Sequence, residues 1–347
     1  MLNVTFAENA NQLAFVVPFI GDLPSYTSLF FRSVASNKCI DVLLFVDREP
    51  VLNVPANVHV RVISRAGILE RIFSSTGLEL AEITGHKLCD FKPFYSSIFS
   101  EELKPYRWWG HCDIDLMFGD LAPWLDQRLS SAYDVVTAGP DSTVGHFTIY
   151  KNDNVVTSEM RMMIENPTYK NILLHPDSSL IDEWGAFEHI YSRRRLRIHQ
   201  TPILQDAIAC NFAPLGITFT PNGSIACIKP QEFGVAYWKD GHTWYESPRR
   251  KPVEVLYIHF MGNKTWWHWF FLRPNSYSRR LHVFSPIGYG LINDVQGMAS
   301  IQYKLIRILQ ALLEFAKVKA GIILRRILNP SAFRRFRRSI TPSGRYK

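Results

Sequence analysis

The amino-acid sequence predicts an α/β protein in which a central, mostly parallel (mixed) sheet is flanked by helices. Residues 13–76 alternate short apolar runs with segments of helical periodicity, a pattern typical of strand–helix–strand units. The 347 residues, 47% of them hydrophobic, are enough to fill the core of a large domain. No charge-free apolar run reaches the roughly 18 residues that a membrane-spanning helix requires.

The first five elements carry most of this prediction. Short apolar runs predict strands over residues 13–18, 40–46 and 58–63, and apolar residues at helical spacing predict helices over 25–35 and 65–76. In open sheets built this way, ligands bind beyond the carboxyl ends of the strands. We therefore expect a binding site where the first two strands end.

The later elements are less regular. We expect a helix that opens near Lys87, further helices over 121–131 and 153–166, and strands over 135–137, 146–150 and 253–259. Residues 213–251 are rich in glycine, proline and aromatic residues, which predicts irregular structure with short strands at best.

The cysteines and the N-terminus indicate a reducing, cytoplasmic location. Five cysteines are an odd number, and they are widely spaced without a Cys-x-x-Cys pair, so neither a disulfide framework nor a structural zinc site is expected. The first apolar run is short and has no basic leader before it, so we interpret it as a strand and not as a signal peptide.

Charge separates the chain into a body and a tail. The whole chain has a net charge of +8. Residues 301–347 hold twelve lysines and arginines against the single acid Glu314, so the net charge of this tail alone exceeds that of the whole chain. We expect a domain over residues 1–272, a linker over 273–300 and a basic amphipathic helical tail over 301–347.

The most informative stretch runs from Trp108 to Asp120, where Asp113 and Asp115 close an apolar, aromatic run. If the run is a strand, side chains two residues apart point to the same face, so the two carboxylates converge. Hard cations such as Mg²⁺ or Mn²⁺ prefer oxygen ligands, which they share with substrate phosphates. The alternative is a pair of solvated acids at a strand end.

A second candidate group follows the last predicted strand. His259 stands at the strand end, with Gly262 and Lys264 shortly after it. The group suits a metal-bound diphosphate, because it offers a ligand nitrogen, a point of close backbone approach and a cation. A histidine that packs in the core or at its rim is the alternative interpretation of His259.

These motifs resemble those of nucleotide-sugar-dependent glycosyltransferases with the GT-A fold, which implies a single Rossmann-type domain with an Asp-x-Asp metal site at the end of a central strand. The stretch from His259 to Trp266 resembles the His-x-x-Gly-x-x-Lys-Pro-Trp motif of the glycogenin-like and lipopolysaccharide galactosyltransferase group. That motif supplies a third metal ligand and a phosphate-binding lysine. Here one residue fewer separates glycine from lysine, and Thr265 replaces the proline.

The chain also resembles bacterial glycosyltransferase-like proteins from capsule and lipopolysaccharide loci, over roughly residues 12–267. Three ordered motifs carry this resemblance. They are Pro18-Phe19-Ile20-Gly21-Asp22-Leu23-Pro24, a Lys-x-x-Asp-x-Lys-Pro-x-Tyr pattern at Lys87, Asp90, Lys92, Pro93 and Tyr95, and the Trp-Gly-His-x-Asp-x-Asp stretch that runs from Trp109 to Asp120.

The resemblance implies transfer of a sugar from a nucleoside diphosphate sugar, expected to be a UDP-sugar, to a hydroxyl of a glycan or lipid-linked glycan in surface-polysaccharide synthesis. It implies Mn²⁺ or Mg²⁺ bound by Asp113, Asp115 and His259. The residues expected near the nucleotide sugar are Pro18, Phe19, Gly21, Asp47, Lys92, Asp113, Gly262 and Lys264. For Asp90 and Lys92, a buried salt bridge that supports the helix is an open alternative.

The acceptor side is marked by three acids around a Trp-Gly pair. Asp182, Glu183 and Glu188 lie where these enzymes place an acceptor-binding or catalytic carboxylate. Such a group deprotonates the acceptor or stabilises an oxocarbenium-like sugar. The alternative is a capped helix start with solvated acids. His146 and Asn152 are further candidates for the border of this site.

Two other classes of function compete with sugar transfer. A metal-dependent phosphohydrolase also uses paired aspartates, although it usually needs more ligands than this sequence offers. A nonenzymatic carbohydrate-binding protein would suit the nine tryptophans but would not need Asp113 and Asp115 beside a lysine that binds phosphate. Nucleic acid is not an expected partner, because the tail has few aromatic residues and an extensive apolar face.

The tail predicts a membrane surface as a further partner. Apolar residues recur at 301, 305, 308, 309, 312, 313 and 316, which is the spacing of one helical face, and basic residues flank them. Such a helix lies in the headgroup region of an anionic membrane, here expected to be the inner face of the plasma membrane. The alternative is a helix packed on the domain and followed by a disordered basic end.

Overall fold

The structure is a computed structural model of the chain. It describes residues 12–24, 26–129, 132–137, 143–200, 217–219, 225–227, 235–247, 250–259, 281–285 and 288–292. The predicted linker and tail lie outside these residues, apart from two short strands between 281 and 292. No helix among the described residues is long and apolar enough to cross a membrane.

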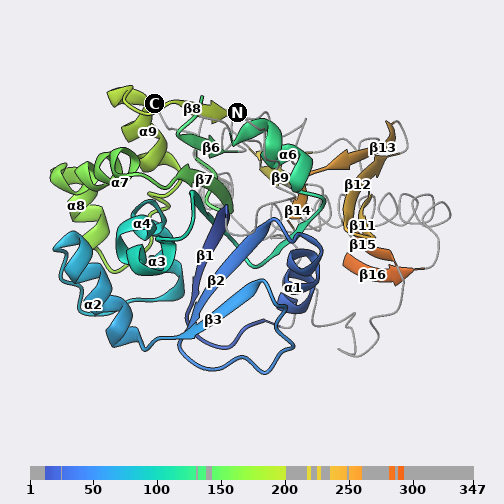
Figure 1. The fold of residues 1–347 in the computed structure, drawn as a ribbon, viewed down its shortest axis with the longest axis horizontal. Coiled ribbons are helices and arrows are strands. Elements are labelled where there is room, and N and C mark those ends of the chain that lie inside the picture. The colour runs from blue at the N-terminus through green and yellow to red at the C-terminus, as the bar shows by residue number, and fades with distance from the viewer. Residues whose placement is uncertain are drawn as a thin grey trace, which may run out of the picture.

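Seven strands form the main sheet in the order β3-β2-β1-β4-β7-β6-β8 (Figure 1). Their bounds are β1 (Leu13–Phe19), β2 (Ile40–Val46), β3 (Val58–Val62), β4 (Trp108–Cys112), β6 (Val135–Thr137), β7 (Phe147–Lys151) and β8 (Ile198–Gln200). Neighbouring strands pair in parallel except at β7, which is antiparallel to both β4 and β6. The predicted fold class, a mixed and mostly parallel sheet with flanking helices, is confirmed.

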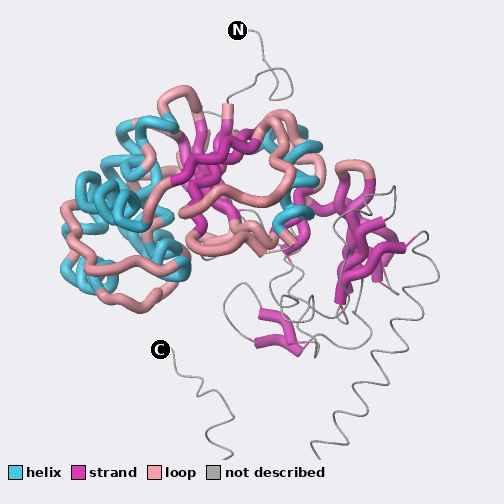
Figure 2. Tube along the Cα trace, turned by 90° about the horizontal axis from the view of Figure 1, so that it is seen from below, coloured by secondary structure: helices cyan, strands magenta, loops and turns pink. Residues whose placement is uncertain are grey.

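Helices cover both faces of this sheet (Figures 1 and 2). They are α1 (Thr27–Ser36), α2 (Arg65–Thr76), α3 (Gly85–Asp90), α4 (Tyr95–Ile98), α5 (Ser100–Leu103), α6 (Ala122–Arg128), α7 (Asn154–Arg161), α8 (Pro167–Leu174) and α9 (Trp184–Arg193), with 3-10 turns η1 (Lys92–Phe94) and η2 (Met162–Glu165). Capping side chains begin several of them: Ser64, Thr84 and Asp153 each accept a backbone N–H of the first turn of α2, α3 and α7.

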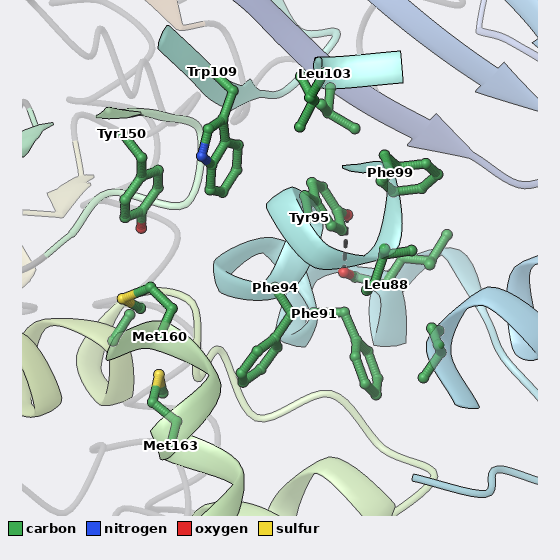
Figure 3. Packing of buried hydrophobic residues seen from close by; sticks show 14 of the residues in the cluster. Leu88, Phe91, Phe94, Tyr95, Phe99, Leu103, Trp109, Tyr150, Met160 and Met163 are labelled. Atoms are coloured by element: carbon green, nitrogen blue, oxygen red, sulfur yellow. Dashed lines mark hydrogen bonds between the residues drawn. The ribbon is translucent and has the colours of Figure 1, made fainter. Parts of the chain in front are cut away.

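Alternating side chains of the strands feed two hydrophobic clusters, one on each face. Leu13, Phe15 and Val17 of β1 pack with residues of α1 and α6, whereas Ala14 and Val16 pack with residues of α2 to α5 and α7 to α9. Figure 3 shows part of the second cluster, in which the aromatic residues of the α3–α5 region face the side chains of β4, β7 and α7. Trp108 and Trp109 are fully buried core residues, so the adjacent Asp-x-Asp motif follows a strand that is packed on both faces.

The helix predicted to open near Lys87 is shorter than expected. It ends at Asp90, and the chain continues through the 3-10 turn η1 into α4 and α5. Proline explains the break, since Pro93 has no N–H to donate and its ring disfavours helical geometry at Lys92. The result is a series of short helical turns packed on one face of the sheet, in which the Tyr95 hydroxyl donates to the carbonyl of Leu88 (Figure 3).

Residues 213–251, predicted to be irregular with short strands at best, hold short strands that pair into sheets, and this pairing was not predicted. Strands β9 (Ile217–Phe219) and β10 (Ile225–Cys227) pair with each other, and a five-stranded antiparallel sheet has the order β13-β12-β11-β15-β16. Its strands are β11 (Val235–Lys239), β12 (His242–Ser247), β13 (Arg250–Val255), β15 (Leu281–Ser285) and β16 (Gly288–Ile292). The β11–β12 hairpin turns at Asp240 and Gly241, which both have positive φ, and an Asp-Gly pair is a strong hairpin signal.

The single strand predicted over residues 253–259 divides in two. Its first part belongs to β13, and its last three residues form β14 (Tyr257–His259), which pairs with β5 (Leu116–Phe118). The division occurs at Leu256, where the chain leaves the five-stranded sheet and crosses to the end of the main sheet. This crossing brings two distant segments of the sequence together.

Candidate metal site and adjoining carboxylates

The candidate site lies where the strand order of the main sheet reverses. The chain runs outward from β1 to β2 and β3 and then crosses to β4 on the other side of β1. The loops that follow β1 and β4 therefore diverge, which leaves a crevice at the carboxyl ends of these two strands. Gly21 follows β1, Asp47 follows β2 and Asp113 follows β4, so all three lie at this edge, as the sequence predicts.

The expectation that Asp113 and Asp115 share one face of a strand is wrong. Strand β4 ends at Cys112, and the two aspartates lie in the turn that leads to β5. The turn is held by the N–H of Asp113, which donates to the carbonyl of His146 over 3.2 Å. The side chain of Asp113 is 36% exposed, whereas that of Asp115 is buried. One carboxylate is therefore open to solvent, and the other is enclosed by protein.

The pairing of β14 with β5 places His259 beside this turn. His259 pairs with Leu116, the residue after Asp115, and its Nε2 lies 3.4 Å from Oδ2 of Asp115. One ligand atom each from Asp113, Asp115 and His259 lie within 4.8 Å of one another. The structure thus brings the two predicted motifs together, and this group of three could hold a metal ion.

The chemistry of the group fits a divalent cation. His259 is buried, and neither of its ring nitrogens makes a hydrogen bond with the described residues. The ring stacks on His146 at 4.2 Å between centroids, and Nε2 of His146 in turn lies 2.9 Å from the hydroxyl of Tyr257. Burial holds the pKa of His146 well below its usual value, so a neutral ring packs against His259. Two carboxylates and an imidazole nitrogen are ligands that suit a divalent cation.

Lys92 connects this group to a second pair of acids. Its ammonium donates to Oδ1 of Asp113 over 2.9 Å and to the carbonyl of Gly145 over 2.7 Å, and it lies 3.4 Å from Oδ2 of Asp182. Burial acts to lower the pKa of Lys92, but the charges of Asp113 and Asp182 raise it well above its usual value. Lys92 is therefore held by ion pairs with Asp113 and Asp182 and not by a salt bridge within its own helix, and its role as a nucleotide ligand stays a prediction.

Gly145 is the residue that sequence reasoning missed. Its carbonyl accepts from Lys92 and lies 2.9 Å from Nδ1 of the fully buried His111. A Cβ at this position would lie 2.6 Å from Oδ2 of Asp182 and 2.9 Å from Oε1 of Glu183, so only glycine lets both carboxylates approach. The sequence offers no signal for this contact, because Gly145 and Asp182 are far apart along the chain.

Of the three acids predicted on the acceptor side, the structure brings two into the group. Burial raises the pKa of Asp182 to about 7, against the opposing effect of Lys92, and burial also raises the pKa of Glu183. Glu183 is half buried and accepts a backbone hydrogen bond from Gly145. Glu188 is exposed on α9 and accepts a hydrogen bond from Tyr169, and no ion pair of the described part links it to Lys92.

The shifted pKa predicts a pH effect on stability. Between pH 4 and 7, Asp182 is ionised in the unfolded chain and protonated in the folded chain. The free energy of unfolding therefore falls as the pH rises to about 7. An Asp182→Asn variant lacks this loss. We expect the variant to gain stability relative to the natural chain over this range, by at most about 1.4 kcal/mol per pH unit. Urea unfolding of both proteins at several pH values measures the difference, and parallel pH profiles would contradict the assignment.

The expected nucleoside side holds a second ordered turn. Gly21 has a φ of +101° and donates its N–H to Oδ1 of Asp47 over 3.0 Å. This hydrogen bond, and then the nearby guanidinium groups of Arg48 and Arg65, hold the pKa of Asp47 below its usual value. The half-buried Pro18 and Phe19 close β1 immediately before the turn.

Four predicted residues are placed elsewhere or not described. Gly262 and Lys264 lie outside the described residues, so their roles stay predictions. Asp90 pairs with Lys87 in the interior, which is the buried salt bridge that the sequence left open. Asn152 donates to the carbonyls of Leu103 and Tyr106 and so supports the loop before β4.

Comparison with known proteins assigns the chain to a family. The sequence matches a family described as a family of unknown function (DUF6625) over residues 15–275, which is more than half of the chain. The chain belongs to this family. The matched residues of this DUF6625 member include Asp113, Asp115 and His259 as well as Lys92, Asp182 and Glu183.

One solved structure similar to this DUF6625 member is the apo form of mouse xyloside xylosyltransferase 1. The two chains share 12% sequence identity, the match covers 57% of this chain and 87% of the mouse chain, and the TM-score is 0.34. A search of the curated proteins gave no match.

Proposed function

We propose that this DUF6625 member is a metal-dependent glycosyltransferase. It moves a sugar from a nucleoside diphosphate sugar, with a uridine nucleotide as the expected carrier, to a hydroxyl of a glycan or lipid-linked glycan. The observation that carries the proposal is the group of Asp113, Asp115 and His259 at the switch point of an α/β sheet. Three protein ligands of this kind leave coordination positions for phosphate oxygens, and the switch point is where α/β sheets bind nucleotides.

The roles of the residues follow from their exposure. A bound Mn²⁺ or Mg²⁺ would stabilise the negative charge that develops on the diphosphate leaving group. We assign the diphosphate to the solvent side of Asp113, because Asp113 is partly exposed whereas Asp115 and His259 are buried. The nucleoside is assigned to the Gly21 turn, together with Asp47, Pro18 and Phe19, at the ends of the neighbouring strands.

Asp182 and Glu183 are assigned to the sugar and the acceptor, in preference to Glu188, which is exposed on α9 and bonded to Tyr169. During transfer the bond from the anomeric carbon to the diphosphate oxygen breaks, the bond to the acceptor oxygen forms, and the acceptor loses its hydroxyl proton. Glu183 is the more accessible carboxylate, and its raised pKa makes it a better proton acceptor than an ordinary glutamate. Asp182 stays buried beside Lys92 and Gly145.

A screen of the purified full chain with Mn²⁺ against a panel of nucleotide sugars tests the proposed function. We expect release of the nucleoside diphosphate from at least one donor, together with sugar transfer when a hydroxyl acceptor is supplied. Release of inorganic phosphate without sugar transfer would identify a phosphohydrolase instead. Sugar binding without any turnover would identify a carbohydrate-binding protein.

The two members of the second motif give a further prediction. His259→Ala is expected to weaken Mn²⁺ and donor binding together, because it removes a metal ligand, and Lys264→Ala is expected to weaken donor binding alone. Isothermal titration with Mn²⁺ and with the donor separates the two effects. His242→Ala is the matched control, since His242 lies on β12 and contacts Glu254. If neither variant changes donor affinity, the pairing of the two motifs is wrong.

We further propose that the basic tail attaches the enzyme to an anionic membrane, where a lipid-linked acceptor would be found, on the cytoplasmic side. The proposal rests on the apolar face and the basic residues after 301, each worth about 1 kcal/mol near such a surface. A chain truncated at Gly297 is expected to lose binding to anionic liposomes in a flotation assay while it keeps donor hydrolysis. Unchanged flotation of the truncated chain would show that another region makes the contact.

A further inference from the structure

We infer that the segment Lys87-x-x-Asp90-x-Lys92 is a positioning unit for the carboxylates of the site. In this inference the buried pair Lys87–Asp90 fixes the loop that precedes Asp182, and Lys92 joins the Asp182 carboxylate to that of Asp113. Its catalytic consequence rests on the proposed function, whereas its structural part does not. None of the three residues is required to touch the substrate.

Asp90 holds the loop through its backbone N–H groups. Its Oδ1 accepts from the N–H of Ser179 and of Ile181, each over 3.1 Å, and from the hydroxyl of Ser178 over 3.3 Å. Its Oδ2 lies 3.1 Å from the same Ser179 nitrogen. Asp90 is fully buried, so these hydrogen bonds have no competition from water.

Lys87 holds the same region through its carbonyl groups. Its ammonium donates to Oδ2 of Asp90 over 2.9 Å, to the carbonyl of Ile172 over 2.8 Å and to that of Asp177 over 3.3 Å. The Lys87 side chain is 1% exposed and that of Asp90 is 0% exposed. The pair therefore ties the end of α8 and both sides of the loop over 177–181 to helix α3.

The loop is strained at the point that the pair holds. Leu180 has a φ of +54°, in the left-handed region that a bulky side chain disfavours, and its side chain is exposed, so apolar packing does not stabilise this conformation. Backbone strain of this kind persists only where the surroundings determine it, and it gathers at functional sites. Here the N–H groups on both sides of Leu180 are bound by the single carboxylate of Asp90.

The strained turn at Leu180 comes two residues before Asp182 and so determines where Asp182 lies in the site. The hydroxyl of Thr143 donates to the carbonyls of Asp182 and Glu183 over 2.6 and 2.7 Å, which fixes the chain directly after the turn. Lys92 lies two residues after Asp90 and meets Asp182 and Asp113 from the other side. The segment from Lys87 to Lys92 therefore holds the loop that carries Asp182 and Glu183. It also binds the carboxylate of Asp113, which is a candidate metal ligand.

Stability alone does not explain such a unit. Replacing a buried ion pair by apolar residues of similar volume is often neutral or stabilising, so a buried pair is weak evidence for a stabilising role. Most contacts of the Lys87–Asp90 pair are made with the loop over 177–181, and that loop ends at the acids. Fixed geometry at the acids is what these contacts provide.

The test compares Asp90→Asn with Asp134→Asn in the full chain, at a temperature at which both are folded by circular dichroism. Asp134 is a matched control, because it is also a buried carboxylate that binds a cation and a backbone N–H, both of Arg197, far from the site. We expect Asp90→Asn to lower kcat by about 100-fold, the effect of a misplacement near 1 Å, with the donor KM and the Mn²⁺ affinity unchanged. Asp134→Asn should leave kcat unchanged.

A second variant separates positioning from a loss of fold. Leu180→Gly removes the cost of the left-handed conformation, so the loop no longer depends on Asp90 to hold it. We expect the double variant Asp90→Asn/Leu180→Gly to recover much of the kcat. We expect its Tm to be lower than the sum of the two single changes gives, because Leu180→Gly relieves strain only while Asp90 holds the turn in the left-handed conformation. Equal kcat losses in the Asp90 and Asp134 variants, or no rescue by Leu180→Gly, would overturn the inference.

The Tm coupling is measured without turnover, so it distinguishes the inference from the proposed function. If the natural chain turns over no nucleotide sugar, the proposed function fails, and the Tm values still decide whether Asp90 holds the Leu180 turn. Additive Tm changes in the double variant would refute the anchoring by themselves.

Discussion

Replacing either Asp113 or Asp115 by asparagine is expected to lower sugar transfer by at least about 100-fold while the chain stays folded. Each change removes a carboxylate from a group of three ligand atoms that lie within 4.8 Å of one another, so the cation binds more weakly and the diphosphate charge is left uncompensated. The fold should survive because asparagine has nearly the same volume as aspartate. Initial rates at saturating donor and a range of Mn²⁺ concentrations measure the effect.

Asp120→Asn is the matched control for this prediction. Asp120 is exposed and closes the same motif, and its Oδ1 accepts from the N–H of Ala122, a hydrogen bond that an amide oxygen can also accept. We expect this variant to keep full activity. Full activity of the Asp113 and Asp115 variants, or activity of the natural chain in excess chelator, would contradict a metal role.

Gly145→Ala is expected to have the second large effect, on activity and on stability together. The new methyl group would lie 2.6 Å from Oδ2 of Asp182 and 2.9 Å from Oε1 of Glu183, closer than carbon and oxygen approach without a shift. Because the Gly145 carbonyl also binds Lys92, a backbone shift would reach Asp113 as well. We expect a loss of about 1–3 kcal/mol in the free energy of unfolding from overpacking and a fall in kcat of about 100-fold.

Gly85→Ala is the control for the added methyl group. Gly85 begins α3, and a Cβ there would meet only the carbonyl of Ile20, at 3.9 Å, an ordinary contact. Alanine favours the helix over glycine, so this variant should be as stable as the natural chain or more so. Urea unfolding and initial rates on both variants complete the comparison. Normal kcat in Gly145→Ala would show that the close approach of the acids to this glycine does not serve turnover.

The sequence predicts the main sheet well because its strands are buried on both faces. Such strands form apolar runs that can be recognised in the sequence without knowledge of the tertiary structure. Among the helices, the one predicted over 65–76 coincides with α2. The five-stranded sheet was missed because its strands lie among glycines, prolines and aromatic residues that hide a period of two. One signal was present, since the Asp240-Gly241 pair marks the β11–β12 hairpin.

The candidate site could be predicted in its residue types but not in its geometry. Asp113, Asp115 and His259 stand out because carboxylates and a histidine follow apolar runs. Their convergence depends instead on a turn after β4 and on the pairing of β14 with β5, which is a long-range contact without a local pattern. Asp113 and Asp115 do converge, but in a turn and not through the predicted same-face arrangement in a strand.

The supporting residues were the hardest to predict. Gly145 acts through the space that its missing side chain leaves for Asp182, and Asp90 acts through backbone N–H groups nearly ninety residues away in sequence. The Gly145 contact is invisible in its residue type, and the residue type of Asp90 does not show which loop its carboxylate binds. A sequence shows which groups can react, whereas these two residues determine where such groups are held.

Binding of a nucleoside diphosphate to the full chain by isothermal titration, with Mn²⁺ and then with excess chelator, tests the metal-dependent donor site most directly. We expect UDP to bind in the presence of Mn²⁺ and to lose most of its affinity in chelator, and we expect the Asp115→Asn variant to bind weakly under both conditions. Equal affinity with Mn²⁺ and with chelator, or equal affinity in the natural chain and the variant, would contradict a metal site formed by Asp113, Asp115 and His259.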